Sequence, residues 1–318
     1  MIPAETVRSL RMMAEAMTPQ MPMSADLLTM LTDDVESNGP ISRLLADHPE
    51  SGTPLFPMRA LAGVKLLVLT GRAPELAHHL RGMMEHVGDP AYTARSRDLF
   101  RRALLDHPDD IRSALDRPVQ QHQPGRSEYL LRGMTMLAAP KVRLLEIGAC
   151  AGLNLMVDRY RWFGRGWEWG DAASPVRLAA GGPRPGDIEI VDRAGCDIEP
   201  RNAADPHDAA ILRSFIPPER EVEELDLNNA IALAAESGIR VEKADAVEWL
   251  REQLSHPGEP GVCTVIWHSL FWWYLGSEDQ TAIEEILAEA SERMQVARVC
   301  YEPHAWAGAM RLQVVTYP

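Results

Sequence analysis

The stretch VRLLEIGACAGLNL, residues 142–155, determines the fold that we expect for this chain. An apolar strand is predicted over 142–147, and it contains an acid, Glu146, next to its end. The loop that follows carries Gly148, Cys150 and Gly152, and a helix is predicted over 152–162. In nucleotide-type cofactor sites, glycines let the backbone approach the ligand, and the free N–H groups of the helix start face it. The segment therefore predicts a cofactor loop, or a tight strand–helix turn without a ligand.

The spacing of the loop discriminates between cofactors. A dinucleotide fingerprint G-x-G-x-x-G that begins at Gly148 needs glycine at positions 150 and 153, where the chain has Cys150 and Leu153. The looser pattern acid-x-Gly-x-x-x-Gly, typical of S-adenosylmethionine methyltransferases, is met by Glu146, Gly148 and Gly152. Such enzymes commonly have a third glycine where Cys150 stands. The spacing favours S-adenosylmethionine over NAD as the cofactor.

Other acidic residues follow the later strands. Asp197 ends the second predicted strand, where a carboxylate can accept hydrogen bonds from a ribose diol. Asp171 competes for the same role by its distance from the loop. Asp245, with Ala246, ends the third predicted strand, where related enzymes place an acid against the adenine amine. A helix N-cap explains these acids equally well, and Asp245 is a good cap candidate.

Strands and helices alternate from about residue 141 onward, which predicts an α/β fold with a doubly wound, mostly parallel, Rossmann-like sheet of the class I methyltransferase kind. The region before it has helical periodicity, so we expect a helical domain at 1–138 and the α/β domain at 139–318. The stretch RPVQQHQPGR, 117–126, is interpreted as a loop or linker. Strands are predicted at 142–147, 187–196, 239–243, 262–267, 297–301 and 311–317, and the later helices at 206–215, 219–237, 246–254 and 280–294.

A histidine follows the fourth predicted strand, in the run VIWHSLFWWYL at 265–275. His268 is a candidate general base that accepts a proton from the methyl acceptor. Glu302 at the end of the fifth strand, with His304 just beyond it, is placed to orient the imidazole. The alternative is a core histidine with a backbone partner. The aromatic run after His268 is expected to pack, although one of its tryptophans could line the pocket.

Composition narrows the functional classes. The formal net charge is −14, without a basic run, so nucleic acid and anionic membranes are not expected partners. The four cysteines are widely separated and form no C-x-x-C pair, so neither a metal site nor a disulfide framework is predicted. The N-terminus lacks the features of a signal peptide, and the longest apolar run is too short to span a bilayer. We expect a cytoplasmic protein with a small-molecule substrate.

At these residues the chain resembles a bacterial family of uncharacterised proteins, domain of unknown function 2332. The similarity rests on LLEIGACAGLNL, on Asp158-Arg159-Tyr160, on GCDIEP at 195–200 and on His268-Ser269. This family is similar to a divergent branch of the methyltransferase fold, whose complete sheet has seven strands. Only one strand is expected after the fifth, so the sheet looks shortened. The resemblance implies a methyltransferase acting on an unknown small molecule, or a non-catalytic cofactor-binding or scaffold protein of the same fold.

Overall fold

The computed structural model describes residues 4–86, 88–304 and 309–317, and the chain forms two compact units. The first unit consists of Met1–Gln121 and Pro206–Leu225, and the second of His122–Asp205 and Asp226–Pro318. The units are not continuous in sequence, because a segment from the middle of the chain belongs with the N-terminal helices. The division passes through one long helix, α10 (Glu221–Ser237).

The first unit is built from helices, as the apolar spacing predicts. Proline occupies the first turn of six of them, where its fixed φ suits the helix and its missing N–H costs nothing. Helix α6 has an additional cap, because the Asp89 carboxylate accepts hydrogen bonds from the N–H groups of Ala91 and Tyr92. The helices are α1 (Ala4–Met17), α2 (Pro22–Glu36), α3 (Ser42–Ala46), α4 (Phe56–Leu69), α5 (Pro74–Leu80), η1 (Met83–His86), α6 (Pro90–Asp106), α7 (Pro108–Leu115) and α9 (Pro206–Ser214).

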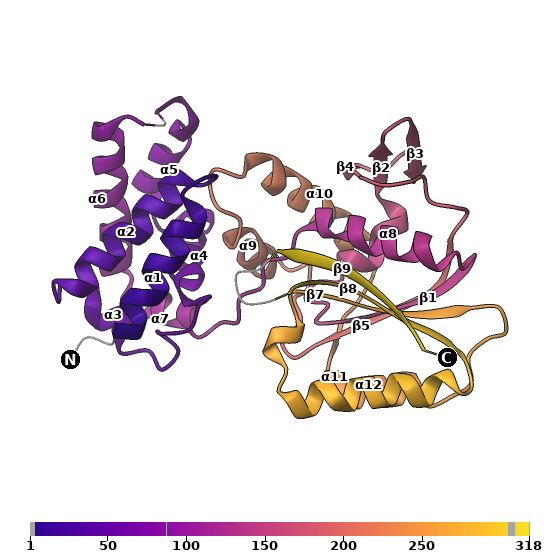
Figure 1. Ribbon diagram of the computed structural model, residues 1–318. Helices are drawn as coiled ribbons and strands as arrows, with labels where there is room; N and C mark the ends of the chain where they lie inside the picture. The colour runs from indigo at the N-terminus through magenta and orange to yellow at the C-terminus, as the bar shows by residue number, and fades with distance from the viewer. Residues whose placement is uncertain (1–3, 87, 305–308, 318) are drawn as a thin grey trace. The chain divides into compact units, whose positions relative to one another are not determined.

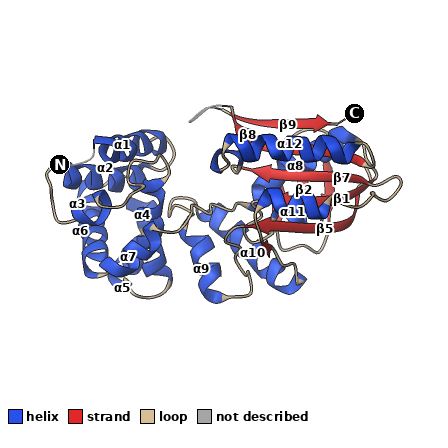
Figure 2. Ribbon diagram, turned by 90° about the horizontal axis from the view of Figure 1, so that it is seen from below, coloured by secondary structure: helices blue, strands red, loops and turns tan. Residues whose placement is uncertain are grey.

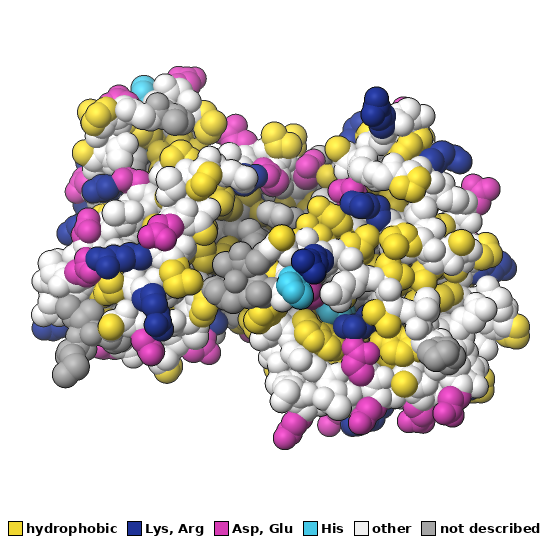
Figure 3. Space-filling model, in the orientation of Figure 1, with side chains coloured by type: hydrophobic (Ala, Val, Ile, Leu, Met, Phe, Trp, Pro, Cys, Tyr) yellow, Lys and Arg dark blue, Asp and Glu magenta, His cyan; other side chains and the backbone are white. Residues whose placement is uncertain are grey.

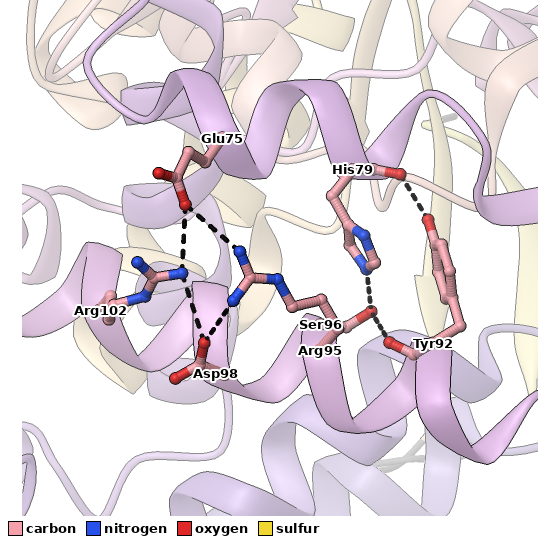
Figure 4. A network of polar contacts seen from close by, with 7 residues as sticks. All are labelled: Glu75, His79, Tyr92, Arg95, Ser96, Asp98 and Arg102. Atoms are coloured by element: carbon pink, nitrogen blue, oxygen red, sulfur yellow. Dashed lines mark hydrogen bonds and ion pairs between the residues drawn. The ribbon is translucent and has the colours of Figure 1, made fainter.

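Helices α5 and α6 are joined by a polar network on one side and an aromatic stack on the other (Figure 4). Glu75 of α5 pairs with Arg95 and Arg102 of α6. The His79 ring stacks on Tyr92 with 4.0 Å between ring centroids, and the Tyr92 hydroxyl donates to the His79 carbonyl. The pair is therefore held by exposed charged contacts and by a half-buried ring stack.

The second unit is built on a six-stranded sheet with the order β6-β5-β1-β7-β8-β9. Its strands are parallel except β9, which runs antiparallel to β8. The strand order reverses at β1, and the carboxyl ends at such a reversal form the usual ligand crevice of open α/β sheets. The strands are β1 (Lys141–Ile147), β5 (Glu189–Asp197), β6 (Glu242–Lys243), β7 (Cys263–Ser269), β8 (Gln295–Pro303) and β9 (Met310–Thr316).

Helices cover both faces of this sheet, which confirms the predicted α/β architecture with a mostly parallel sheet (Figures 1 and 2). Helices α11 (Ala246–Gln253) and α12 (Ser277–Ser291) pack on one face, where their side chains form a core with Leu145, Ile147 and Ile266. Helix α8 (Ser127–Leu137) packs on the other face, against β8 and β9. All six predicted strands form, and the third is only two residues long.

The helix predicted over 152–162 is wrong. The chain instead forms a short 3-10 helix, η3 (Asn154–Arg159), and then β2 (Arg161–Gly164). The Tyr160 hydroxyl donates to the Leu153 carbonyl and the Trp162 indole to the Val157 carbonyl, so side chains occupy acceptors that a longer helix would use. A second sheet follows, with the order β3-β2-β4, formed with β3 (Trp167–Gly170) and β4 (Arg177–Ala179).

The described part of the chain contains no helix that combines the length and the apolar character of a membrane span. All four cysteines are buried and free. Acidic and basic side chains are interspersed on the face that Figure 3 shows. That surface therefore carries no continuous stripe of positive charge.

Candidate functional site

The loop after β1 adopts left-handed backbone conformations at three alternate residues. Gly148, Cys150 and Gly152 have φ values of +69°, +50° and +70°. Cys150 is the one that carries a side chain, and it stands where related methyltransferases commonly have a glycine. Its buried thiol has a pKa well above the usual value, first because of burial and then because of Asp197. The thiol is therefore protonated and inert near neutral pH.

Packing already accounts for both glycines. A Cβ on Gly148 would lie 2.3 Å from the Phe271 ring, and a Cβ on Gly152 would lie 3.0 Å from Ile239 and 3.2 Å from Val241. The space above each glycine is thus filled by protein in this structure, rather than left for a ligand.

Asp197 lies at the end of β5 beside this loop. Its Oδ2 accepts a hydrogen bond of 2.9 Å from the Cys150 N–H, and its Oδ1 accepts one of 2.8 Å from the Glu199 N–H. The carboxylate therefore ties the loop after β1 to the loop after β5. Each oxygen of a carboxylate has two lone pairs, so one acceptor position remains on each.

The structure does not bring the other two acids to the same place. Asp171 follows β3 of the small sheet, is exposed, and accepts a hydrogen bond from the Ala173 N–H. Asp245 is the N-cap of α11 and accepts from the N–H groups of Val247 and Glu248, with Ala246 buried behind it. The cap that the sequence offered as an alternative is therefore formed at Asp245.

Glu146 is the most unusual acid of the second unit, since it is only 2% exposed. Its Oε1 accepts a 2.6 Å hydrogen bond from Asn154, whose Oδ1 in turn accepts from Ser127. Its Oε2 is buried and has no partner among the described residues. Burial raises the pKa of this carboxyl to about 8, although the Asn154 hydrogen bond acts in the opposite direction. The group is therefore mostly protonated at neutral pH.

Two buried donors accompany this acceptor. Trp267 of β7 is the register neighbour of Glu146, and its indole N–H faces that carboxyl closely enough to favour the ionised form, although the pair falls short of full hydrogen-bond geometry. The Nη2 of Arg126 is also buried without a described partner. Burial lowers the pKa of Arg126 to about 10, and the acidic groups of Glu146 and Glu302 act in the opposite direction. A guanidinium without a hydrogen bond is costly to bury, so this position suits an anionic group.

The sequence did not single out Arg126 or its neighbour His122. Both fall in the polar, proline-containing stretch 117–126, which was interpreted as a loop or linker. His122 is buried 3.5 Å from Asn154, and burial, followed by the charge of Arg126, lowers its pKa to about 3. The sequence feature that could have indicated them is a histidine and an arginine, His122 and Arg126, four positions apart just before a helix.

His268 and Glu302 are brought into contact by the pairing of β7 with β8. The His268 Nδ1 and the Glu302 Oε1 are 2.8 Å apart, and the same oxygen accepts from the N–H groups of Phe271 and Trp272. His268 is fully buried and stacks on the Trp272 ring at 4.9 Å. Burial lowers its pKa, so the imidazole is neutral at pH 7. With Glu302 as a carboxylate acceptor, the proton of the neutral imidazole is on Nδ1, which donates to Glu302, and Nε2 is the unprotonated nitrogen.

The predicted site residues face opposite sides of the sheet. Glu146 and Trp267 alternate with residues of the α11–α12 core, so their side chains point to the α8 face. His268 lies two residues after Ile266 and therefore points to the α12 face, where Arg298 approaches its Nε2 to 3.5 Å. Glu302 Oε2 is buried without a described partner. The Arg126 guanidinium interacts electrostatically with the carboxyl groups of both Glu146 and Glu302.

Comparison with known proteins identifies the family. A family model described as "Uncharacterized protein conserved in bacteria (DUF2332)" matches residues 7–318. The chain belongs to this family. A search of curated proteins and a search of solved structures each found no match. In the described residues, no group of three His, Cys, Asp or Glu side chains is arranged to hold a metal ion.

Proposed function

We propose that this member of the DUF2332 family binds S-adenosylmethionine and transfers its methyl group to a small molecule. One observation carries the proposal. At the carboxyl end of β1, where the strand order reverses, a buried carboxyl oxygen of Glu146 and the Nη2 of Arg126 have no hydrogen-bond partner among the described residues. Such polar atoms are costly when unpaired, so the position suits a ligand with both a donor and an acidic group.

The topology supports the same proposal. The sheet has five parallel strands, in the order β6-β5-β1-β7-β8, followed by the antiparallel β9. This order is that of doubly wound sheets, which bind nucleotide-type cofactors where the strand order reverses. We infer that the sheet is a class I methyltransferase sheet with one strand after the fifth. This inference is an analogy at the level of fold, so the site residues and not the topology must carry the function.

The chain's own residues would hold the cofactor as follows. Glu146 and Arg126 would bind the ammonium and carboxylate of its amino-acid end, and the spare lone pairs of Asp197 would bind the ribose. Asp245 and Ala246 would border the adenine. The cofactor supplies an activated methyl group, and the protein positions the acceptor. Because the Phe271 ring covers Gly148, binding requires Phe271 to move away from the loop.

His268 would accept the proton of the methyl acceptor, with Glu302 holding the imidazole in one tautomer. Since His268 is fully buried behind Phe271 and Trp272, the same movement that opens the loop must also expose its Nε2. The acceptor that we propose is a small molecule, because a net charge of −14 repels a phosphate backbone. The free thiols suit a cytoplasmic location.

Calorimetry on the whole chain tests cofactor binding. S-adenosylmethionine and S-adenosylhomocysteine should give heat, and NAD should not. Arg126→Gln should weaken binding at least tenfold, because charge-assisted hydrogen bonds contribute about 1.5–3 kcal/mol. Arg132→Gln, in the exposed part of the neighbouring helix α8, is the matched control and should bind as the wild type does. No heat with either sulfur ligand contradicts the proposal.

A second candidate is a non-catalytic cofactor-binding or scaffold protein of the same fold. It is favoured by the protein side chains that fill the space above Gly148 and Gly152, and by backbone amides that already satisfy Asp197 and Asp245. Binding without transfer of a labelled methyl group to any acceptor in a metabolite extract would favour a sensor. Absence of both binding and transfer would favour a scaffold.

A further inference from the structure

The first unit contains an apolar cavity of about 250 Å³, separate from the residues described so far. Helices α1, α2, α4, α5 and α6 and the segment after α9 contribute to its wall. Long flexible side chains form much of that wall, including Met17, Met23, Met58, Leu61, Leu80 and Phe100. Methionine is unbranched and polarizable, so such a wall can adapt to ligands of different shape.

The buried polar groups of the wall already have protein partners. The Lys65 ammonium donates to the Ile216 carbonyl and to Glu224, each at 2.6 Å. The Ser96 hydroxyl donates to the Tyr92 carbonyl and lies beside His79 (Figure 4). The Ser24 and Ser214 hydroxyls also have partners, Glu219 and the Ile211 carbonyl. No buried group of the wall therefore requires a polar partner from a ligand.

We propose that this cavity binds a neutral, unbranched aliphatic molecule of about ten non-hydrogen atoms. An apolar cavity of about 150 Å³ stays dry and holds benzene, which has six such atoms, and scaling by volume gives the size. Arg81 and Glu221 are the exposed residues of the wall, so we place the mouth of the cavity beside them. A terminal hydroxyl at this mouth stays in water while the chain is buried. A charged group at the buried end of the molecule is disfavoured, since the buried polar side chains of the wall already have protein partners.

Calorimetry with straight-chain 1-alkanols from butanol to dodecanol tests the proposal on the whole chain. Affinity should rise about fourfold for each methylene, the factor that corresponds to about 0.8 kcal/mol per buried CH₂. The rise should stop at about nine carbons, where the cavity is full. A negative heat-capacity change should accompany binding. No binding, or a rise that continues to dodecanol as for adsorption at a surface, overturns the proposal.

Two variants locate the binding. Leu80→Trp adds bulk at the half-buried rim and should weaken octanol binding at least tenfold. Leu105→Trp makes the same exchange at a partly exposed position of α6 outside the cavity, and it should bind as the wild type does. Met58→Ala removes three non-hydrogen atoms from the wall and enlarges the cavity by about their volume. The longest alkanol that still gains affinity should therefore be about three carbons longer than for the wild type. Equal octanol affinity in wild type and folded Leu80→Trp contradicts the assignment.

Two further measurements keep the test decisive. Circular dichroism shows whether each variant keeps its helices, and if Leu80→Trp unfolds, the shift of the limit in Met58→Ala carries the assignment. Sedimentation of the wild type tests the other occupant, a side chain from a second copy of the chain. Dimerisation that Leu80→Trp abolishes, together with no alkanol binding, would assign the cavity to that second copy and overturn the proposal.

Discussion

Replacing Glu146 with glutamine should change how the stability of the second unit depends on pH. The side chain is 2% exposed and its pKa is raised to about 8, first of all by burial. Glutamine has nearly the same shape, keeps a carbonyl oxygen for Asn154 to donate to, and does not titrate. The variant therefore isolates the cost of ionising this carboxyl.

The sign follows from the raised pKa. In the unfolded chain a glutamate has a pKa of about 4.3. Below that pH both states are protonated and Glu146 costs nothing. Between about 4.3 and 8 the unfolded chain releases a proton that the folded chain keeps, so stability falls by about 1.4 kcal/mol per pH unit. Between pH 5 and 8 the free energy of unfolding of the wild type should fall by about 3–4 kcal/mol relative to that of Glu146→Gln.

Tryptophan fluorescence is the appropriate assay. All eight tryptophans of the sequence lie in residues 122–205 and 226–318, so this signal reports on the unit that contains Glu146. Urea unfolding at pH 5, 6, 7 and 8 gives the free energy of unfolding for each chain. The control is Glu248→Gln on the exposed side of α11, which leaves Glu146 in place and should show the wild-type profile. Parallel profiles for wild type and Glu146→Gln would refute the reasoning, because they mean that the folded carboxyl ionises as readily as the unfolded one.

Three further predictions concern the site. Asp197→Asn should weaken S-adenosylmethionine binding at least tenfold in calorimetry, because Asp197 lies beside the loop after β1. Asp171→Asn should leave the affinity unchanged, and the opposite ranking of the two variants would assign the ribose contact to Asp171. Phe271→Ala should strengthen that binding by uncovering Gly148, and equal or weaker binding by the folded variant contradicts the covering role. His268→Gln should lower the melting temperature by about 4–8 °C, because about 2 kcal/mol of buried hydrogen bonding with Glu302 is lost. If the imidazole is the general base, the same variant should also reduce turnover by about 10²–10⁴. An unchanged melting temperature would contradict the buried contact between His268 and Glu302.

The sequence predicts the elements of the second unit well, because short apolar strands and amphipathic helices alternate regularly there. The strand at 142–147 is bordered by turn residues on both sides, and the structure forms it over Lys141–Ile147. The helix expected at 152–162 failed for a tertiary reason. The apolar spacing of that segment suits a helix, but Tyr160 and Trp162 donate to backbone carbonyls and end it after six residues.

Local sequence could not decide the roles of the acids. Asp245 precedes a helix and also follows a strand, so a cap and a cofactor contact give the same local pattern, and only the hydrogen bonds to Val247 and Glu248 show the cap. Arg126 was missed for a different reason. Its proximity to Glu146 depends on the packing of α8 on the sheet, which composition and spacing within 117–126 do not indicate.

The features that support a bound ligand are buried polar atoms without partners among the described residues, rather than the glycines of the loop after β1. Both glycines of the loop are explained by φ and by close side chains, so they do not require a cofactor. The buried Oε2 atoms of Glu146 and Glu302 and the Arg126 Nη2 have no hydrogen-bond partner in the described part of the chain. Each unpaired buried group costs about 1–3 kcal/mol, and a folded domain has only about 5–15 kcal/mol of stability. Glu302 lies on the opposite face of the sheet from Glu146, so a ligand that carries both a donor and an acidic group would recover the cost at Glu146 and Arg126.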